Sequence, residues 1–310
     1  MLDVFLKTVP FFAVIALGYG AGRTRFFSEE ATAYLTKFVF YFALSAMLFR
    51  FSADLSIGEL FNWRFVIAYL WGSFFVWGLA TGVSFLSGKP VTEAAVEAQC
   101  AVIGNVGFLG IPMLALLMGE VAIGPLMMVL AMDLIVFGSI IVILITVAKG
   151  GESGLAAVKI AVVGLVKNPM IVAISLGLIW STFNLPRPAP LMDLVTILGA
   201  AATPGALFAI GASLASKSAE RLTTAVWLSF AKLVLHPLFV AFAALFLFPV
   251  DPFQAAVMIA AASFPVAGNI YILAQHYGVA PQRVSASILV STMFAVATIA
   301  PVVAWVSQLY

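Results

Sequence analysis

The chain has 310 residues, of which 64% are hydrophobic and only 9% are charged. Soluble globular domains carry about 25% charged residues, so this composition excludes a soluble enzyme and predicts an all-α integral membrane protein. The net charge is only +2 and the sequence contains no run of like charges, which excludes a nucleic-acid partner. The single cysteine, Cys100, excludes an intrachain disulfide.

Long intervals without Asp, Glu, Lys or Arg define the predicted membrane spans. Six intervals are each long enough to cross about 30 Å of hydrocarbon as a helix. They run over 65–88, 98–119, 168–186, 194–216, 252–282 and 284–310. Four more spans follow when one or two charges are tolerated, at 4–22, 31–51, 122–148 and 222–248. The sequence therefore predicts ten transmembrane helices, and it lacks the period-2 alternation of a membrane β-barrel.

Basic residues between the spans predict the orientation. Counted on alternate sides, one side holds nine and the other holds four. The nine are Arg23, Arg25, Lys89, Lys149, Lys159, Lys167, Lys217, Arg221 and Arg283, and the four are Lys7, Arg50, Arg64 and Arg187. Because Lys and Arg concentrate in cytoplasmic loops, the first side is expected inside, and ten spans then place both termini outside the cytoplasm.

The polar segment 149–154 marks the midpoint of the chain. It divides the chain into two halves of five spans, 1–148 and 168–310, and residues 149–167 are expected to be a short cytoplasmic linker. The stretch 10–18 reads PFFAVIALG and the stretch 169–177 reads PMIVAISLG, with Pro, Ile, Leu and Gly matching at an offset of 159. Common composition is an alternative explanation for these four identities. With five spans in each half, a true repeat would be inverted, which is the plan of many secondary transporters.

Spans four and nine, which the repeat equates, are interrupted by helix breakers. Span four contains GNVGFLGIP over 104–112, and span nine contains SFPVAGN over 263–269. Gly costs about 1 kcal/mol relative to Ala in a helix interior, and Pro removes a backbone hydrogen bond. At 1.5 Å per residue, Asn105 is expected about 16 Å and Pro265 about 18 Å inside the bilayer.

Unwound backbone at that depth is tolerated only where it is buried in protein or lines a cavity. Half-helix N-termini suit a carboxylate there, and carbonyl ends suit a cation. The substrate-binding candidates are Gly104, Asn105, Gly107, Pro112, Pro265, Gly268 and Asn269. The alternative is a proline kink or glycine-mediated packing, both common in membrane helices.

These features resemble the auxin efflux carrier family. The resemblance covers essentially the whole chain and rests on GNVGFLGIP, on Pro265 and Asn269 in span nine, on the Lys-Asn-Pro motif at 167–169 and on the ten spans. It implies a sodium/bile-acid symporter-like fold in which broken helices four and nine cross. Spans one, two, six and seven would form a scaffold that makes a homodimer, and spans three to five and eight to ten would form a transport domain moving as an elevator.

The same resemblance implies organic anions as substrates and, for a bacterial member, the cell inner membrane as location. Asn105 and Pro112 match the family pattern of span four, and Pro265 and Asn269 match that of span nine. The chain lacks the long hydrophilic central loop of the plant branch. Small carboxylates are therefore expected rather than auxin.

Three residues inside the spans are candidates for proton or ion coupling. Asp133 is the only acid in span five, and Lys232 is expected at a similar depth in span eight. An intramembrane charge costs at least about 2.5–3.5 kcal/mol and normally faces a cavity or a partner. Asp133 either titrates during transport or forms a static ion pair with Lys232. His236, on the same helix face as Lys232, either relays a proton or packs as a hydrogen-bonded residue.

The sequence has no P-loop, no G-x-S-x-G elbow and no dinucleotide-binding motif, and its His and Cys residues lack zinc spacing. We therefore expect no ATP-driven transport, no cofactor, no metal site and no enzyme activity. The predicted function is that of a secondary transporter, an efflux carrier for a small organic anion, driven by its own gradient or by protons or sodium. A channel, or a membrane receptor for an organic acid, is the alternative. Glu93 and Glu97 are expected at the membrane interface.

Overall fold

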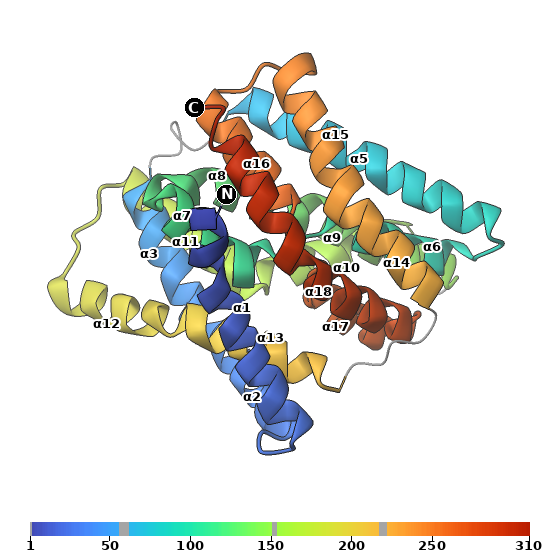
Figure 1. Cartoon of the computed structure of the whole chain (residues 1–310). Coiled ribbons are helices and arrows are strands. Elements are labelled where there is room, and N and C mark those ends of the chain that lie inside the picture. Colours follow the sequence, from blue (N-terminus) through green and yellow to red (C-terminus); the bar gives the residue numbers. More distant parts are fainter. Residues whose placement is uncertain (1, 56–61, 151–153, 217–221) are drawn as a thin grey trace.

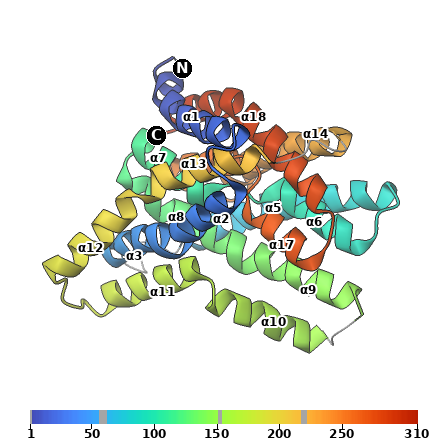
Figure 2. The same cartoon turned by 90° about the horizontal axis from the view of Figure 1, so that it is seen from below.

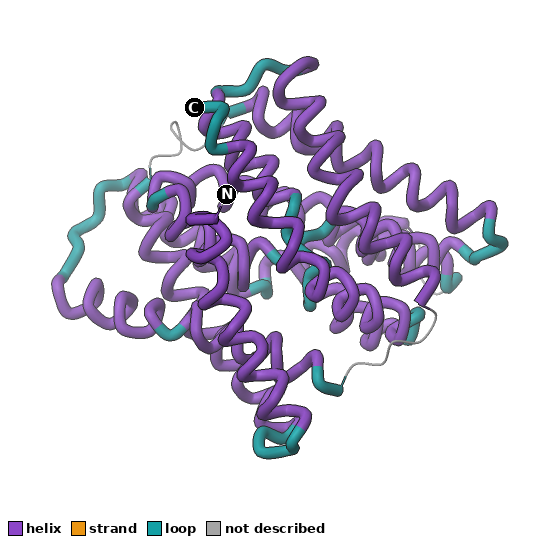
Figure 3. The backbone as a smooth tube through the Cα atoms, in the orientation of Figure 1, coloured by secondary structure: helices purple, strands orange, loops and turns teal. Residues whose placement is uncertain are grey.

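The computed structural model describes residues 2–55, 62–150, 154–216 and 222–310. In this part of the chain every regular element is a helix, and one isolated β-bridge is present (Figure 3). Lys217 and Arg221, used above for orientation, and residues 151–153 of the expected linker lie outside the described residues.

The first half of the chain forms the following helices, in which η marks a short π-helical or 3₁₀ segment. They are α1 (Leu2–Arg23), α2 (Glu29–Phe38), η1 (Val39–Ala43), α3 (Leu44–Asp54), α5 (Trp63–Leu86), α6 (Val91–Val102), η2 (Val106–Gly110), α7 (Ile111–Met118), η3 (Glu120–Ala122), α8 (Ile123–Met132), η4 (Asp133–Phe137) and α9 (Gly138–Ala148).

The second half continues with another series. It consists of α10 (Gly154–Val166), α11 (Pro169–Thr182), α12 (Ala189–Ala200), α13 (Ala202–Leu214), α14 (Leu222–Phe230), η5 (Ala231–Leu235), α15 (His236–Phe242), η6 (Ala243–Leu247), α16 (Pro252–Ala262), α17 (Asn269–Tyr277) and α18 (Pro281–Val306).

The chain is a multi-pass membrane protein. Six helical stretches of the described residues are long and apolar enough to cross a membrane. They are Glu29–Asp54, Trp63–Leu86, Glu120–Ala148, Ala189–Leu214, Leu222–Leu247 and Pro281–Val306. The bent pair of α10 and α11 makes a seventh if it is counted as one span. The ten-span count stays a prediction.

The segment 149–167 differs from the expected linker, because most of it is the apolar helix α10. Lys159 and Lys167 suggested a loop, but the residues around Lys159 are aliphatic and favour a helix. Asn168 accepts hydrogen bonds from the backbone N–H groups at the start of α11, and Pro169 is the first residue of that helix. This cap explains the 64° bend between α10 and α11.

The helices divide into two groups by their contacts. In the first, α1 packs along α13, and α3 packs against α11 and α12. In the second, α5 packs against α6 and α15, while α14 and α16 pack against α18. Figure 1 shows α5 and α15 side by side, and Figure 2 shows α10 beside α9. The groups meet where α13 contacts η2 and where α1 contacts α18.

Glycines allow the closest contacts of the first group. A Cβ atom at Gly18 of α1 would lie 2.2 Å from the backbone oxygen of Phe208 in α13, and one at Gly177 of α11 would lie 2.4 Å from the Cβ of Ser52 in α3. No side chain fits at those distances. Small residues that let backbones touch are the usual means of helix packing in membranes.

The offset of 159 in the sequence also relates helix boundaries. It carries Glu29, the first residue of α2, to position 188, one residue before α12 begins at Ala189. It carries Val91, the first residue of α6, to position 250, two residues before α16 begins at Pro252. Helices in the two halves therefore recur at almost the same spacing.

Candidate functional site

The two predicted interruptions are real gaps between helices. The first break, residues 103–105, separates α6 from η2, and the second break, residues 263–268, separates α16 from α17. Gly104 lies in the middle of the first break, and Pro265 and Gly268 lie in the second. These residue types disfavour a continuous helix.

The two breaks lie against each other and exchange backbone hydrogen bonds. The N–H of Asn105 donates to the carbonyl oxygen of Pro265 at 2.8 Å, and the N–H of Ala267 donates to that of Ile103 at 3.1 Å. Together these bonds form an antiparallel bridge centred on Gly104. Each break thus donates one N–H and accepts one, so the crossing satisfies unwound backbone that has no water to bond.

Residues of α18 support the second break. The N–H of Val266 donates to the side-chain oxygen of Ser291 at 3.1 Å. Ser291 is fully buried. A buried hydroxyl therefore meets a backbone donor that the crossing itself leaves unpaired.

A cavity of about 40 Å³ lies at the crossing. Its polar or glycine lining consists of Gly104, Asn105, Gly107, Asp133, Gly268 and Asn269, and its apolar lining consists of Phe40, Ile103, Phe108, Leu130, Leu134, Met170 and Ala267. Phe40 of η1 and Met170 of α11 come from the first helix group, whereas the breaks come from the second. The cavity therefore lies between the two groups.

The helix ends around this cavity carry partial positive charge. η2 begins directly after Asn105, whose carbonyl oxygen accepts from the N–H groups of Leu109 and Gly110, and α17 begins at Asn269. The N–H groups of Val106, Ile270 and Tyr271 donate to carbonyl oxygens just before the helices. The other N–H groups of the first turns have no partner within the helix. Such ends attract an anion.

Two buried oxygens at the cavity have no hydrogen-bond partner within the described residues. They are Oδ1 of Asn269 and Oδ2 of Asp133. Buried polar atoms are normally paired, so both oxygens are available to a donor group that enters the cavity.

Asp133 lies mid-span and is bonded to a neutral group rather than to a cation. Tyr69 of α5 donates its hydroxyl hydrogen to Oδ1 of Asp133 at 2.6 Å. Asp133 is only 3% exposed. No ion pair within 4.0 Å joins Asp133 to Lys232, although the structure describes both residues. The direct static pair considered in the sequence analysis is therefore not what the structure contains.

Lys232 and His236 form a second buried group. The Lys232 ammonium donates to the carbonyl oxygen of Ala262 at 2.5 Å and to Nδ1 of His236 at 3.1 Å. Because an ammonium only donates, Nδ1 accepts, and Nε2–H donates to the hydroxyl oxygen of Ser73 at 2.9 Å. Both ring nitrogens of His236 are thus engaged.

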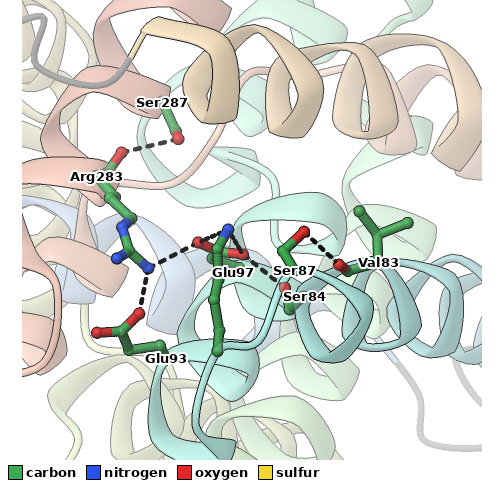
Figure 4. Close-up of polar contacts among 8 residues, drawn as sticks. Val83, Ser84, Ser87, Glu93, Glu97, Arg283 and Ser287 are labelled. Carbon is green, nitrogen blue, oxygen red and sulfur yellow. Dashed lines mark hydrogen bonds and ion pairs between the residues drawn. The ribbon is translucent and has the colours of Figure 1, made fainter.

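Glu97, expected near the membrane interface, is buried inside the protein by its partners. It is 1% exposed and accepts hydrogen bonds from Ser84 at 2.5 Å and from Lys89 at 2.7 Å. Arg283 at the start of α18 contacts Glu97 at 3.0 Å and Glu93 at 2.5 Å. Figure 4 shows Arg283 between the two glutamates. Burial is possible because two cations surround the carboxylate, one of them 186 residues away in sequence.

The sequence profile of a family described as "Membrane transport protein" matches residues 3–303. The chain belongs to this family, the auxin efflux carrier family. The assignment confirms the predicted family and the prediction of a transporter rather than an enzyme.

Two curated relatives align with nearly the whole chain. A protein of Rhizobium meliloti (strain 1021) named "Putative malonate transporter" is 29% identical over 302 residues, covering 96% of this chain and 94% of its own length. A protein of Escherichia coli (strain K12) named "Uncharacterized transporter YfdV" is 26% identical over 317 residues, covering 100% of this chain and 99% of its own length.

In this member of the auxin efflux carrier family, the structure gathers most of the predicted site residues. Gly104, Asn105, Gly107, Gly268, Asn269 and Asp133 line the cavity. Pro265 contributes a carbonyl oxygen to the bridge. Pro112, near the start of α7, and the pair Lys232 and His236 are not part of the cavity lining described here.

Sequence reasoning missed Tyr69 and Ser73, which bond the predicted coupling residues. The two are four residues apart and therefore share one face of α5. This spacing of two polar residues in a mostly apolar span could have indicated from the sequence that one face of the helix bonds buried polar groups.

Proposed function

We propose that the chain is a secondary transporter of a small organic anion, such as a carboxylate, which binds at the crossing of the two breaks. The observation that carries the proposal is the cavity where the N-termini of η2 and α17 meet beside Asn105 and Asn269. The Rhizobium meliloti relative is named for malonate, a small dicarboxylate, and we extend that substrate class to this chain.

The binding chemistry follows from dipoles and amides. Each helix N-terminus carries about half an elementary positive charge, so two of them attract one carboxylate group with about one full charge. The side-chain amides of Asn105 and Asn269 supply neutral donors beside them. The cavity lining described here includes no Lys or Arg, so the substrate is held without a full positive charge in contact.

Asp133 lines the same cavity, and its negative charge opposes that of a bound anion. Protonation of Asp133 removes this repulsion and turns Oδ2 into a hydrogen-bond donor. The proposal therefore includes one proton carried on Asp133 with the anion. Anion binding is then tighter at low pH, where Asp133 is protonated, and weaker at high pH, where it is charged.

The proposed movement is an elevator. We assign α1, α2–α3, α11 and α12–α13 to a scaffold that dimerises, and the remaining spans to a transport domain. Support comes from the two contact groups and from a cavity at their boundary. The movement would carry the crossing and its anion past Phe40 and Met170 of the scaffold.

The proposed architecture is ten spans in two inverted five-helix repeats, 1–148 and 168–310. The repeated helix boundaries at an offset of 159 and the reciprocal hydrogen bonds of the two breaks support it. We place the protein in the inner membrane of a bacterial cell with both termini outside the cytoplasm. The proposal of efflux rests on the family alone.

The test is transport of malonate and other small carboxylates by reconstituted vesicles containing Asn105→Ala or Asn269→Ala. We expect each variant to lose at least about tenfold in transport, the equivalent of one good hydrogen bond to a charged group. Gln282→Ala is the matched control, because it removes an exposed amide at the start of α18. If both asparagine variants bind and move substrate like the parent, the crossing is structural and the proposal fails.

A further inference from the structure

The Lys232 side chain lies at the carbonyl side of the crossing. It belongs to η5, in the middle of the span Leu222–Leu247, and it is 0% exposed. Its ammonium donates to the carbonyl oxygen of Ala262, the last residue of α16. A Cβ atom at Gly104 would lie 3.3 Å from both Nζ and Cε of Lys232. The ammonium thus binds the last carbonyl group of α16 and lies beside Gly104 of the first break.

Two helix C-termini leave negative charge at this place. Each carries about half an elementary negative charge on its last carbonyl groups, which have no partner within the helix. The bridge brings the ends of α6 and α16 together, so their sum is about one negative charge. One ammonium neutralises it.

Broken-helix transporters commonly use such carbonyl ends to coordinate the sodium ion that drives transport. A sodium ion bound here and the Lys232 ammonium would both be stabilised by the negative charge of these helix ends. Both would also bind the Ala262 carbonyl oxygen, which Lys232 already occupies.

We propose that Lys232 is a tethered cation that replaces a coupling sodium ion at the carbonyl side of the crossing. The inference rests on the proposed function and deepens it, because it determines which ion drives transport. Lys232 is a positioning residue: it holds the two helix ends together and does not touch the substrate. His236 and Ser73 fix its direction through the chain of hydrogen bonds described above.

The first measurement compares transport of a carboxylate by the parent in sodium, potassium and N-methylglucamine buffers. The expected result is the same rate in all three. A parent that needs sodium overturns the tethered cation while leaving the anion carrier intact. A parent that moves and binds no carboxylate refutes the proposed function, and the second measurement below then decides on Lys232 alone.

The second measurement uses thermal unfolding of Lys232→Ala and Lys232→Met without substrate. Alanine leaves a space beside the Ala262 carbonyl that sodium or methylammonium can enter, whereas methionine fills that space with an uncharged side chain. We expect sodium or methylammonium to raise the melting temperature of Lys232→Ala saturably, and tetramethylammonium to have no such effect because it cannot donate a hydrogen bond. The parent and Lys232→Met should not respond.

Transport gives the third reading. Lys232→Ala should lose about 10- to 100-fold without small cations, the range of a lost hydrogen bond to a charged group, and should recover with sodium or methylammonium. If Lys232→Ala folds only when one of these cations is present, that result also supports the proposal. The proposal is overturned if no cation stabilises or rescues Lys232→Ala, or if Lys232→Met transports like the parent.

Discussion

Two groups of polar residues among the described residues, one partly buried and one fully enclosed, differ in how their charges are paired. The end cluster consists of Lys89, Glu93, Glu97 and Arg283, and each of its charges contacts an opposite charge within 3.0 Å. The central network consists of Tyr69, Ser73, Asp133, Lys232 and His236, and its acid and its base bond neutral groups instead.

The difference indicates what each group does. Burying a charge is costly, and direct pairing with full hydrogen bonding offsets most of that cost. The end cluster meets this condition and ties α6 to α18 and to the loop that follows α5, which suits a structural role. In the central network, Asp133 lines the cavity, where its carboxylate can respond to a bound anion or a proton. Lys232 is held against the end of α16 by the Ala262 carbonyl oxygen.

The largest effect is expected from Glu97→Gln in the end cluster. Loss of the carboxylate leaves Arg283 and Lys89 without their shared partner, and breaking a buried pair costs about 3–5 kcal/mol. Lys89 can turn to solvent, so we expect the lower end, about 3 kcal/mol, seen as a lower melting temperature in detergent. Carboxylate transport per folded molecule should stay unchanged.

Glu93→Gln is the matched control for that prediction. The Glu93 side chain is 29% exposed, and Arg283 is its one ion-pair partner among the described residues. Its loss should therefore lower the melting temperature much less. Equal melting temperatures for Glu97→Gln and the parent would show that the cluster does not hold the helices together.

The next effect is expected from Asp133→Asn, and on transport rather than on stability. Asparagine still accepts the Tyr69 hydroxyl hydrogen but cannot carry a proton, so transport should fall by about 10- to 100-fold, or 1.4–2.8 kcal/mol. The remaining transport should lose the rise toward low pH that the parent shows. Normal expression with unchanged pH dependence would remove the proton role of Asp133.

Smaller effects are expected from replacing two serines of α5, one of which bonds each group. Ser84→Ala removes a hydrogen bond to the Glu97 carboxylate, and we expect a loss of about 1.5 kcal/mol in stability with normal transport. Ser73→Ala removes a neutral hydrogen bond to His236, worth about 1 kcal/mol, and should also slow transport because His236 no longer orients Lys232. Equal transport by the two variants would contradict the division between the groups.

The helix breaks show how far the sequence could predict the site. Gly104 and Pro265 predict interruptions because Gly and Pro have low helix propensity, and the helices are interrupted at both residues. That they pair with each other was only implied by the family resemblance, because hydrogen bonds between segments 160 residues apart have no local signal. The helix α10 was missed because Lys159 made an apolar helix look like a loop.

The partners of buried polar residues were the least predictable feature. Tyr69 bonds Asp133 and Glu97 bonds Arg283 only because three or more helices pack in a particular order. A span pattern gives depth but not the face that meets a neighbour, so it could not show that Lys89 and Arg283 enclose Glu97. The candidate coupling residues could be identified because a charged residue in an apolar span is evident from the sequence alone, without knowledge of its partner.

The smallest effect is expected from Arg187→Ala. This variant tests whether the distance within an ion pair or the burial of its side chains determines its contribution to stability. Arg187 lies 2.5 Å from Asp54, the same distance that joins Arg283 to Glu93, but its side chain is 46% exposed and that of Asp54 is 58% exposed. Water screens such a pair, which is worth about 0–1 kcal/mol. The melting temperature should therefore barely change in Arg187→Ala and should fall clearly in Arg283→Ala, which uncovers two glutamates. Equal decreases in melting temperature for the two variants would mean that ion-pair distance, rather than exclusion of water, determines how strongly each ion pair stabilises the protein.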